Sequence, residues 1–331
     1  MQLDSWKATM RQALAAGDQA TVGCLPKTDL HCHALLSAPL SAYEQLAGHR
    51  LPPPPQMFGD FKNFLDYIST NLLPVLATPH GVGSIIRAAL ERMRNDGVVY
   101  TEMSFDLLIP EFVGLSHAEF ADLIAAECAR VADRLHVAPE IGVARGLPID
   151  QVTPRVQAWL ASGVFRGIDL YDDENLGIVS DFQPLYRLAA EHGLRLKAHA
   201  GELCGPERVR ESVEILNVHA VQHGVRAVDD PAVVDLLVKR GTVLHMCPTS
   251  NRALGICPSF AEHPARRLFD SGVKITVNTD DFTLFGASAT DEIFNLQAMG
   301  FSADEIVQIV ENGLTEIPEG QAVRLLPRTG C

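Results

Sequence analysis

The 331-residue sequence lacks any concentration of positive charge. Its formal net charge is −14, and its lysines and arginines are scattered along the chain. Proteins that bind nucleic-acid backbones need a clustered basic face to neutralise phosphates. The charge pattern therefore predicts that nucleic acid is not a partner.

Long apolar runs are also missing. The sequence contains no stretch of about 18 apolar residues, the length that a membrane-spanning helix requires. Residues 1–20 are polar and mixed in charge, where a secretory signal would be apolar. We therefore expect no membrane association and a cytoplasmic location.

Cysteine is sparse and carries no pairing pattern. The seven cysteines are an odd number without C-x-x-C spacing, which favours reduced thiols over a disulfide framework. Zinc ribbons are unlikely for the same reason. The P-C-x-x-C signature of the small zinc deaminases that act on nucleic acids is absent too.

What the sequence does contain is a regular alternation of helical and apolar stretches. Apolar residues make up 47% and aromatic residues 6% of the chain, so aliphatic side chains would fill the core. A chain of this length suits two average domains or one large α/β barrel. The expected strands are residues 27–33, 98–105, 137–144, 164–170, 195–199, 220–224, 242–246 and 274–279.

Helical patterns separate these strands, and a helix over 302–312 closes the series. Eight such units predict one α/β domain over residues 1–331, a (β/α)8 barrel of the TIM type. A short opening helix is expected at 4–16. A long excursion at 34–61, which contains four consecutive prolines, is expected to form a lid or pocket wall, although a plain surface connection would also fit.

Two histidines alternate in the first strand, which reads Thr28-Asp29-Leu30-His31-Cys32-His33. The period of two along a strand sends His31 and His33 to one side and Cys32 to the other. Two imidazoles on one face can hold one metal ion. They could equally be incidental, because a metal site needs three or four ligands.

Further candidate ligands stand where later strands end. Catalytic groups of such barrels gather at the carboxyl ends of the strands. His199 with Glu202 ends the fifth expected strand, His223 the sixth, and Asp280 with Asp281 the eighth. Three histidines and one carboxylate would suit catalytic zinc, with the remaining groups free for proton transfer and substrate contact.

These segments together resemble the adenosine deaminase family of metal-dependent barrel hydrolases. The resemblance runs in order over roughly residues 26–300. It is carried by Pro26–His33, Gly97–Tyr100, His199–Glu202, His223–Arg226, Cys247–Asn251 and Asn278–Asp281.

The resemblance implies a hydrolytic deaminase with one zinc ion per chain. The implied metal ligands are His31, His33, His199 and Asp280, of which Asp280 also serves catalysis. In the family, the residue matching Glu202 protonates purine N1, the residue matching His223 acts as base or orients the attacking hydroxide, and the residue matching Asp281 hydrogen-bonds N7.

The chemistry of the reaction is consistent with those roles. An amino-bearing aromatic carbon is a poor electrophile, so a strong nucleophile and a protonated ring are both needed. Zinc lowers the pKa of a bound water to about 7, and Glu202 would protonate the ring. Glu202 therefore needs a raised pKa. Asp281 must also carry or share a proton, because N7 is only an acceptor.

The sequence departs from the family pattern at the positions that choose the substrate. Leu-Asp-Gly, whose aspartate touches ribose, is replaced by Ala34-Leu35-Leu36. The glycine whose amide serves purine N3 is replaced by Asp172, which puts close backbone approach in question. Phe282, which follows Asp281, occupies a position at which the family usually has a proline. We count Leu35, Tyr171, Asp172 and Gly201 as substrate-binding candidates, with Tyr171 either stacking on a ring or forming a plain wall.

The sequence thus predicts a zinc-dependent deaminase of an adenosine-like or adenine-like aminopurine that releases ammonia. An N6-substituted aminopurine or another amino-heterocycle is the alternative substrate. Other readings are a metal-dependent amide or ester hydrolase on the same barrel, or a catalytically silent binding protein. No sequence feature indicates an oligomeric state.

Overall fold

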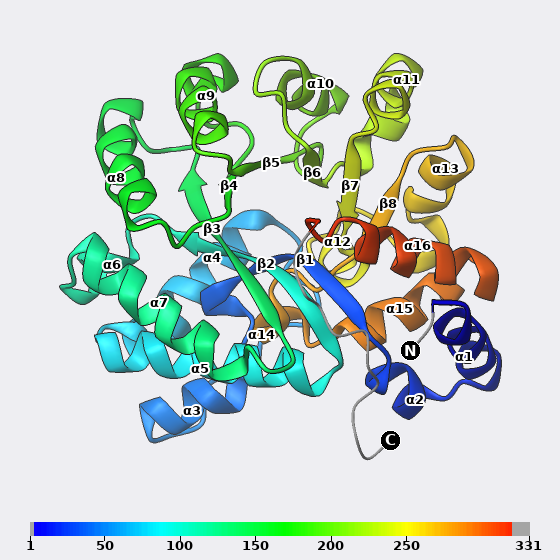
Figure 1. Cartoon of the computed structure of the whole chain (residues 1–331), viewed down its shortest axis with the longest axis horizontal. Coiled ribbons are helices and arrows are strands. Elements are labelled where there is room, and N and C mark those ends of the chain that lie inside the picture. The colour runs from blue at the N-terminus through cyan, green and yellow to red at the C-terminus, as the bar shows by residue number, and fades with distance from the viewer. Residues whose placement is uncertain (1–2, 320–331) are drawn as a thin grey trace.

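Eight parallel strands form the centre of the protein, seen in a computed structural model that describes residues 3–319. Each strand pairs with the next along the chain (Figure 1). They are β1 (Lys27–His33), β2 (Val98–Asp106), β3 (His136–Ala144), β4 (Gly167–Tyr171), β5 (Arg195–Ala200), β6 (Ala220–His223), β7 (Val243–Met246) and β8 (Ile275–Val277).

The chain closes the barrel just beyond β8. The Asp280 N–H donates to the His31 carbonyl oxygen at 2.9 Å, and Cys32 forms a parallel bridge with Asp280. This contact confirms the predicted (β/α)8 barrel, and it places a residue after β8 directly beside the alternating histidines of β1. The last residues of the predicted domain, 320–331, lie outside the described part.

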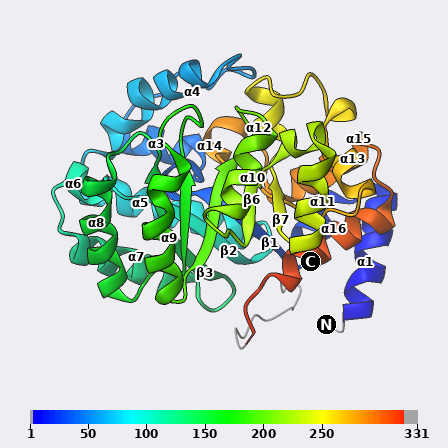
Figure 2. The same cartoon turned by 90° about the horizontal axis from the view of Figure 1, so that it is seen from above.

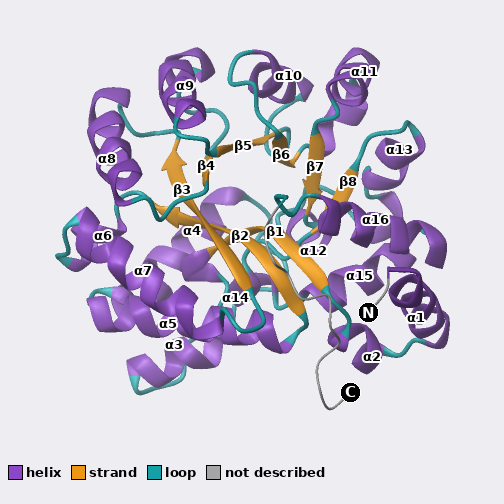
Figure 3. Ribbon diagram, in the orientation of Figure 1, coloured by secondary structure: helices purple, strands orange, loops and turns teal. Residues whose placement is uncertain are grey.

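Helices surround the strands (Figure 3). In chain order they are α1 (Leu3–Ala16), α2 (Gln19–Cys24), α3 (Leu40–Ala47), α4 (Phe61–Tyr67), α5 (Pro79–Asn95), α6 (Ile109–Val113), α7 (His117–Val131), α8 (Ile149–Ser162), α9 (Gln183–Glu191), α10 (Pro206–Glu214), α11 (Pro231–Arg240), α12 (Pro248–Ala253), α13 (Ala265–Asp270), α14 (Phe282–Phe285), α15 (Ala289–Ala298) and α16 (Ala303–Thr315).

The opening helix matches the prediction closely. In α1, Trp6, Met10 and Leu14 are buried, as their helical spacing requires. The Trp6 indole N–H donates to the Pro26 carbonyl oxygen at 3.0 Å. Helix α1 thereby anchors the residue that precedes β1.

The segment at 34–61 is less irregular than its four prolines suggest. It contains the short 3-10 helix η1 (Ala34–Leu36) and α3, and only the part after α3 is extended. Two further helical turns, η2 (Ile68–Leu72) and η3 (Leu73–Leu76), follow α4. Figure 2 shows α4 at one end of the barrel, away from the chain termini.

The region after β8 also holds helices that the sequence analysis did not anticipate. Helix α15 begins at Ser288, whose side chain and that of Asp291 form a reciprocal capping box. The S-x-x-D spacing was a readable signal for this helix. The short helix α14 turns the chain immediately after Asp281 and so places residues 282–285 beside the barrel mouth.

Most of the described cysteines fit the prediction of reduced thiols. Five are free, among them Cys32 and Cys247, whereas Cys24 is disulfide-bonded; Cys331 lies outside the described residues. Within residues 3–319, no helix combines the length and the apolar character that crossing a bilayer demands.

Candidate metal centre and active site

Three imidazoles and one carboxylate converge at the mouth of the barrel. His31 Nε2 lies 3.0 Å from His199 Nε2 and 3.5 Å from Asp280 Oδ1. His33 Nε2 lies 3.6 Å from the same oxygen. Ligands about 2.0–2.1 Å from a tetrahedral zinc ion are separated by roughly 3.3 Å. The distances from His31 to His199 and from Asp280 to His31 and His33 are close to this value, and the ring nitrogens of His31, His33 and His199 lie within 4.8 Å of one another, so these groups can share one metal ion.

The outer nitrogens of two of these rings are held by other side chains. His199 Nδ1 lies 3.2 Å from Asp169 Oδ1, and His31 Nδ1 lies 3.3 Å from Cys247 Sγ. Such contacts orient metal-binding imidazoles and set their tautomer. Burial lowers the pKa of His31 far below its usual value and that of His33 to about 3. The imidazoles of His31 and His33 are thus neutral, which is the metal-binding form.

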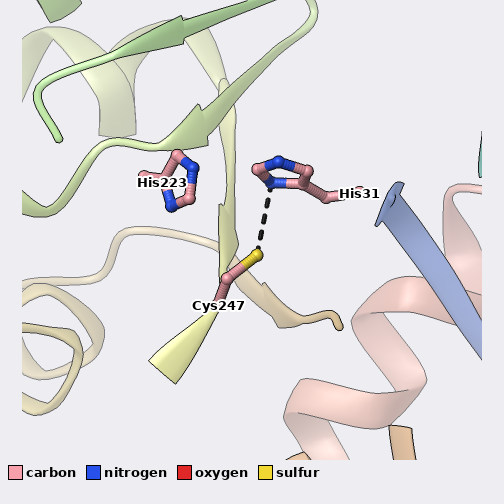
Figure 4. A group of neighbouring side chains, drawn as sticks. All are labelled: His31, His223 and Cys247. Atoms are coloured by element: carbon pink, nitrogen blue, oxygen red, sulfur yellow. Dashed lines mark hydrogen bonds between the residues drawn. The ribbon is translucent and has the colours of Figure 1, made fainter. Parts of the chain in front are cut away.

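Cys247 comes close to two histidines but suits a supporting position better than a ligand position. Figure 4 shows it beside His31 and His223, whose ring centroids lie 4.6 Å apart. The thiol contacts Nδ1 of His31, whereas the other donors face Nε2, and one imidazole cannot bind one ion through both nitrogens. Burial also raises the pKa of Cys247 well above its usual value, so the thiol stays protonated.

Glu202 and His223 face each other next to the metal-binding groups. His223 Nε2 lies 3.3 Å from Glu202 Oε2 and 3.8 Å from Asp280 Oδ2. Asn251 Nδ2 donates to Glu202 Oε1 at 3.1 Å and lies 3.2 Å from His223 Nδ1. His263 Nε2 in turn contacts Asn251 Oδ1 at 3.1 Å. Asn251 therefore positions both proton-transfer candidates.

The electrostatics of Glu202 match the requirement set by the sequence. Burial, reinforced by the nearby carboxylates of Asp280 and Glu174, raises the pKa of Glu202 well above its ordinary value. The backbone N–H groups of Gly201, Glu202 and Leu203 donate to the Glu174 carboxylate at 2.7, 2.8 and 2.8 Å. A protonated Glu202 is thus held on a loop that one carboxylate pins in place.

Asp281 has an acidic side chain without a partner. Its Oδ1 is buried and makes no hydrogen bond to any described residue. Burial, together with the charges of Asp280 and Glu202, raises its pKa well above the ordinary value. A buried polar atom that stays unpaired is costly. Asp281 is therefore suited to bind a polar atom of a ligand.

Backbone strain is concentrated at this site. Among residues 3–319, four non-glycine residues have positive φ, and three of them are Asp172 (83°), His223 (61°) and Asp280 (56°). Such conformations persist where the surrounding structure holds them, often at functional sites. At Asp172 the conformation is one that glycine adopts readily. The left-handed backbone is thus compatible with the family's glycine position, although a carboxylate now projects from it.

A cavity joins these groups. It is lined by His33, His199, His223, Glu202, Asp280 and Asp281, by Tyr171 at the end of β4 and Asp172 directly after it, and by apolar side chains that include Leu36, Phe61, Phe64, Leu65 and Ile68. The apolar wall thus comes mainly from α4 and η2, which follow the predicted 34–61 excursion.

Two of the substrate-binding candidates, Leu35 and Gly201, do not line the cavity that holds the other candidates. Leu35 lines a neighbouring cavity together with Ala34. Gly201 acts through its N–H bond to Glu174, and a Cβ there would meet Val209. Phe282, the substitute for proline, packs under the Arg92 guanidinium at 4.1 Å.

We expect Asp169→Asn to weaken metal binding about 10–100-fold, the usual cost of losing a partner of a metal-binding histidine. Asp169 is fully buried and touches His199 Nδ1, and an amide cannot supply the same negative charge. Competition with a chromophoric chelator would measure the affinity. Asp181→Asn, on an exposed residue, is the matched control. Equal affinity in all three proteins would refute this role.

The family model described as adenosine deaminase matches residues 49–325. The chain belongs to the adenosine deaminase family. Family membership makes it a hydrolase that acts on carbon–nitrogen bonds, as predicted. His31 and His33 precede the matched range, so their place in the site depends on the distances above.

Full-length relatives support the family assignment. An adenine deaminase of Agrobacterium fabrum is 29% identical, over 92% of this chain and 98% of its own. The crystal structure of an adenine deaminase from Arthrobacter aurescens has a TM-score of 0.80 at 28% identity, covering 88% of this chain and 93% of its own. An amidohydrolase from Burkholderia ambifaria with bound zinc shares the fold, with a TM-score of 0.78 at 24% identity, covering 91% and 87% of the two chains.

The sequence analysis missed the residues that support the site. Cys247 and Asn251 stand inside a motif quoted for the family, and Asp169 and Glu174 flank Asp172, yet none was given a role. A polar residue within about five positions of a strand's carboxyl end was the available signal, since such groups need partners when they are buried.

Proposed function

We propose that this protein is a zinc-dependent hydrolytic deaminase of a 6-aminopurine base. The observation that carries the proposal is the shared cavity, in which three of the four proposed metal ligands, His33, His199 and Asp280, lie beside Glu202, whose pKa is raised, and an unpartnered Asp281 oxygen. A proton-donating carboxyl group next to metal-binding side chains suits the attack of water on an amino-bearing ring carbon.

The proposed ligands of one zinc ion per chain are His31, His33, His199 and Asp280. The three ring nitrogens lie within 4.8 Å of one another, and Asp280 Oδ1 lies 3.5 and 3.6 Å from those of His31 and His33, so three nitrogens and one oxygen gather where a zinc ion would bind. When bound, zinc lowers the pKa of a coordinated water to about 7 and so supplies the nucleophile. The Burkholderia ambifaria neighbour contains zinc, which supports this choice of metal.

The side chains around the cavity divide the proton transfers between them. Glu202 donates its proton to ring N1, which makes C6 electrophilic, and His223 accepts the proton of the attacking water. The protonated Asp281 carboxyl donates a hydrogen bond to N7. A C–O bond forms at C6, the proton held by His223 passes to the amino group, and the C6–N bond breaks to release ammonia. The proton on N1 stays on the oxopurine product, and the proton of the new C6 hydroxyl returns to Glu202.

The surroundings of the cavity favour a free base over a nucleoside. The carboxylate that meets ribose in the family pattern is absent, because Ala34, Leu35 and Leu36 replace that motif. Asp172 adds a carboxylate acceptor to the cavity, and a free base offers a ring N–H that a nucleoside lacks. Two relatives with whole-chain similarity are adenine deaminases.

Ammonia release from a panel of compounds would test the proposal directly. We expect the zinc-loaded protein to deaminate adenine with a kcat/KM at least about tenfold above that for adenosine. This factor is what the loss of one good polar contact by adenosine would cause. Pterins and simple amides serve as controls. A preference for adenosine would refute the base specificity, and cleavage of amides alone would refute the deaminase assignment.

A further inference from the structure

A second cavity of about 340 Å³ adjoins the catalytic one. It lies between η1, the turns η2 and η3, and the start of α6. His33, Leu36, Leu65, Ile68 and Tyr171 line both cavities. The two spaces therefore meet beside a proposed metal ligand, where the reacting part of a substrate would sit.

Aliphatic side chains form most of this second cavity. Leu72 and Leu76 are almost fully buried at its inner end. Leu65 and Phe112, which also line it, are 40% and 45% exposed. Single large apolar side chains are common on protein surfaces and need no explanation. When several are grouped around an apolar cavity, they indicate a binding site.

The few polar groups on its wall are mostly paired. Tyr171 Oη donates to the Asp106 carboxylate, and the same carboxylate accepts from the Leu108 N–H at 2.7 Å. Ser104 Oγ, in contrast, is buried and has no hydrogen-bond partner among the described residues. The cavity thus suits an apolar group and offers one hydroxyl for a hydrogen bond.

We propose that the substrate is an aminopurine that carries an apolar substituent, which occupies this second cavity. The inference rests on the proposed function, since it places the purine at the metal centre. A cavity of 340 Å³ has room for on the order of ten water-sized groups at about 30 Å³ each. The substituent is an alkyl or alkenyl chain within that size, with room for a hydroxyl near Ser104.

Burial of the substituent's carbon chain would make the enzyme specific for substituted aminopurines. Each methylene that leaves water for an apolar cavity contributes a free energy equal to about a fourfold change in binding. Because Leu35 and Leu36 stand where the family pattern has a ribose-binding aspartate, the same substitution that removes the ribose contact adds apolar wall to the second cavity.

The test measures kcat/KM of the zinc-loaded enzyme for adenine and for a series with one- to five-carbon chains attached at N6, which keeps the ring N–H of the free base. A second series with the same chains at N9 is the comparison, and release of ammonia or of the alkylamine is followed. We expect kcat/KM in the N6 series to rise about fourfold per carbon. If both series fall with chain length while adenine reacts, the second cavity is not a substrate site. If no aminopurine reacts at all, the proposed function fails instead.

Variants at the rim provide an independent readout. Phe112 lines only the second cavity and is exposed, so replacing it should leave folding intact. We expect Phe112→Asp to lower the ratio of kcat/KM for the best long-chain substrate to that for adenine by about tenfold or more, the effect of two lost methylene contacts. Phe112→Leu, the matched control, should keep most of that ratio.

A space-filling variant tests the same cavity from inside. Leu108→Trp should shift the preferred chain to a shorter length, because the larger ring occupies part of the 340 Å³. Circular dichroism would establish that each variant is folded. An unchanged ratio in Phe112→Asp, together with an unchanged length preference in Leu108→Trp, would overturn the proposal.

Discussion

Replacing Glu202 with glutamine is expected to lower kcat by about 10²–10⁴-fold while the metal stays bound, which is the range typical of a well-placed general acid. Burial and neighbouring carboxylates raise the pKa of Glu202, so the wild-type side chain is neutral and protonated. Glutamine has the same shape and charge but no acidic proton. The loss therefore isolates proton donation from packing.

The measurements are steady-state kinetics with adenine and metal content by atomic emission. Glu214→Gln is the matched control, because Glu214 is exposed on the neighbouring helix α10. Near-normal turnover in Glu202→Gln would contradict the assigned acid. Loss of metal in that variant would show that Glu202 supports the metal site instead.

Replacing His199 with alanine is expected to abolish both metal binding and turnover. His199 Nε2 lies 3.0 Å from His31 Nε2, so its removal takes away one of four donors. The loss of metal affinity should exceed the 10–100-fold loss that removal of a partner of a metal-binding histidine causes. It also leaves the buried Asp169 without its histidine contact, so folding has to be measured in parallel.

Removing the metal from the wild-type protein separates the effect of losing the metal from the effect of misfolding. A chelator should abolish activity in the intact protein, and added zinc should restore it. His192→Ala is the control, since His192 is exposed at the end of α9. A His199→Ala protein that is folded, metal-bound and active would contradict the assignment of His199 as a metal ligand.

The barrel could be predicted because its signals are local. Strands such as β1 and β5 are short aliphatic runs, and the helices between them have helical periodicity and clear ends, so counting them was enough. The segments that escaped prediction, including α14 and η1, are single turns. Their conformation depends on packing against the barrel mouth more than on local sequence preference.

The site was predictable in part for the same reason. Groups at the carboxyl ends of parallel strands must meet at one face of a barrel, so His31, His199 and Asp280 could be placed together from their positions alone. Their mutual distances depend on strand register and on the bridge between Cys32 and Asp280. Neither of these can be read from a strand's own residues.

What the sequence by itself determined is the barrel and the set of chemical groups at its mouth, because both follow from periodicity and from residue type. Only the tertiary structure decided which atoms those groups face. It placed Asn251 between Glu202 and His223 and Glu174 under the loop of Gly201. It also formed an apolar cavity from η1, η2, η3 and α6. These contacts join segments far apart in the chain, and side-chain packing in three dimensions determines them.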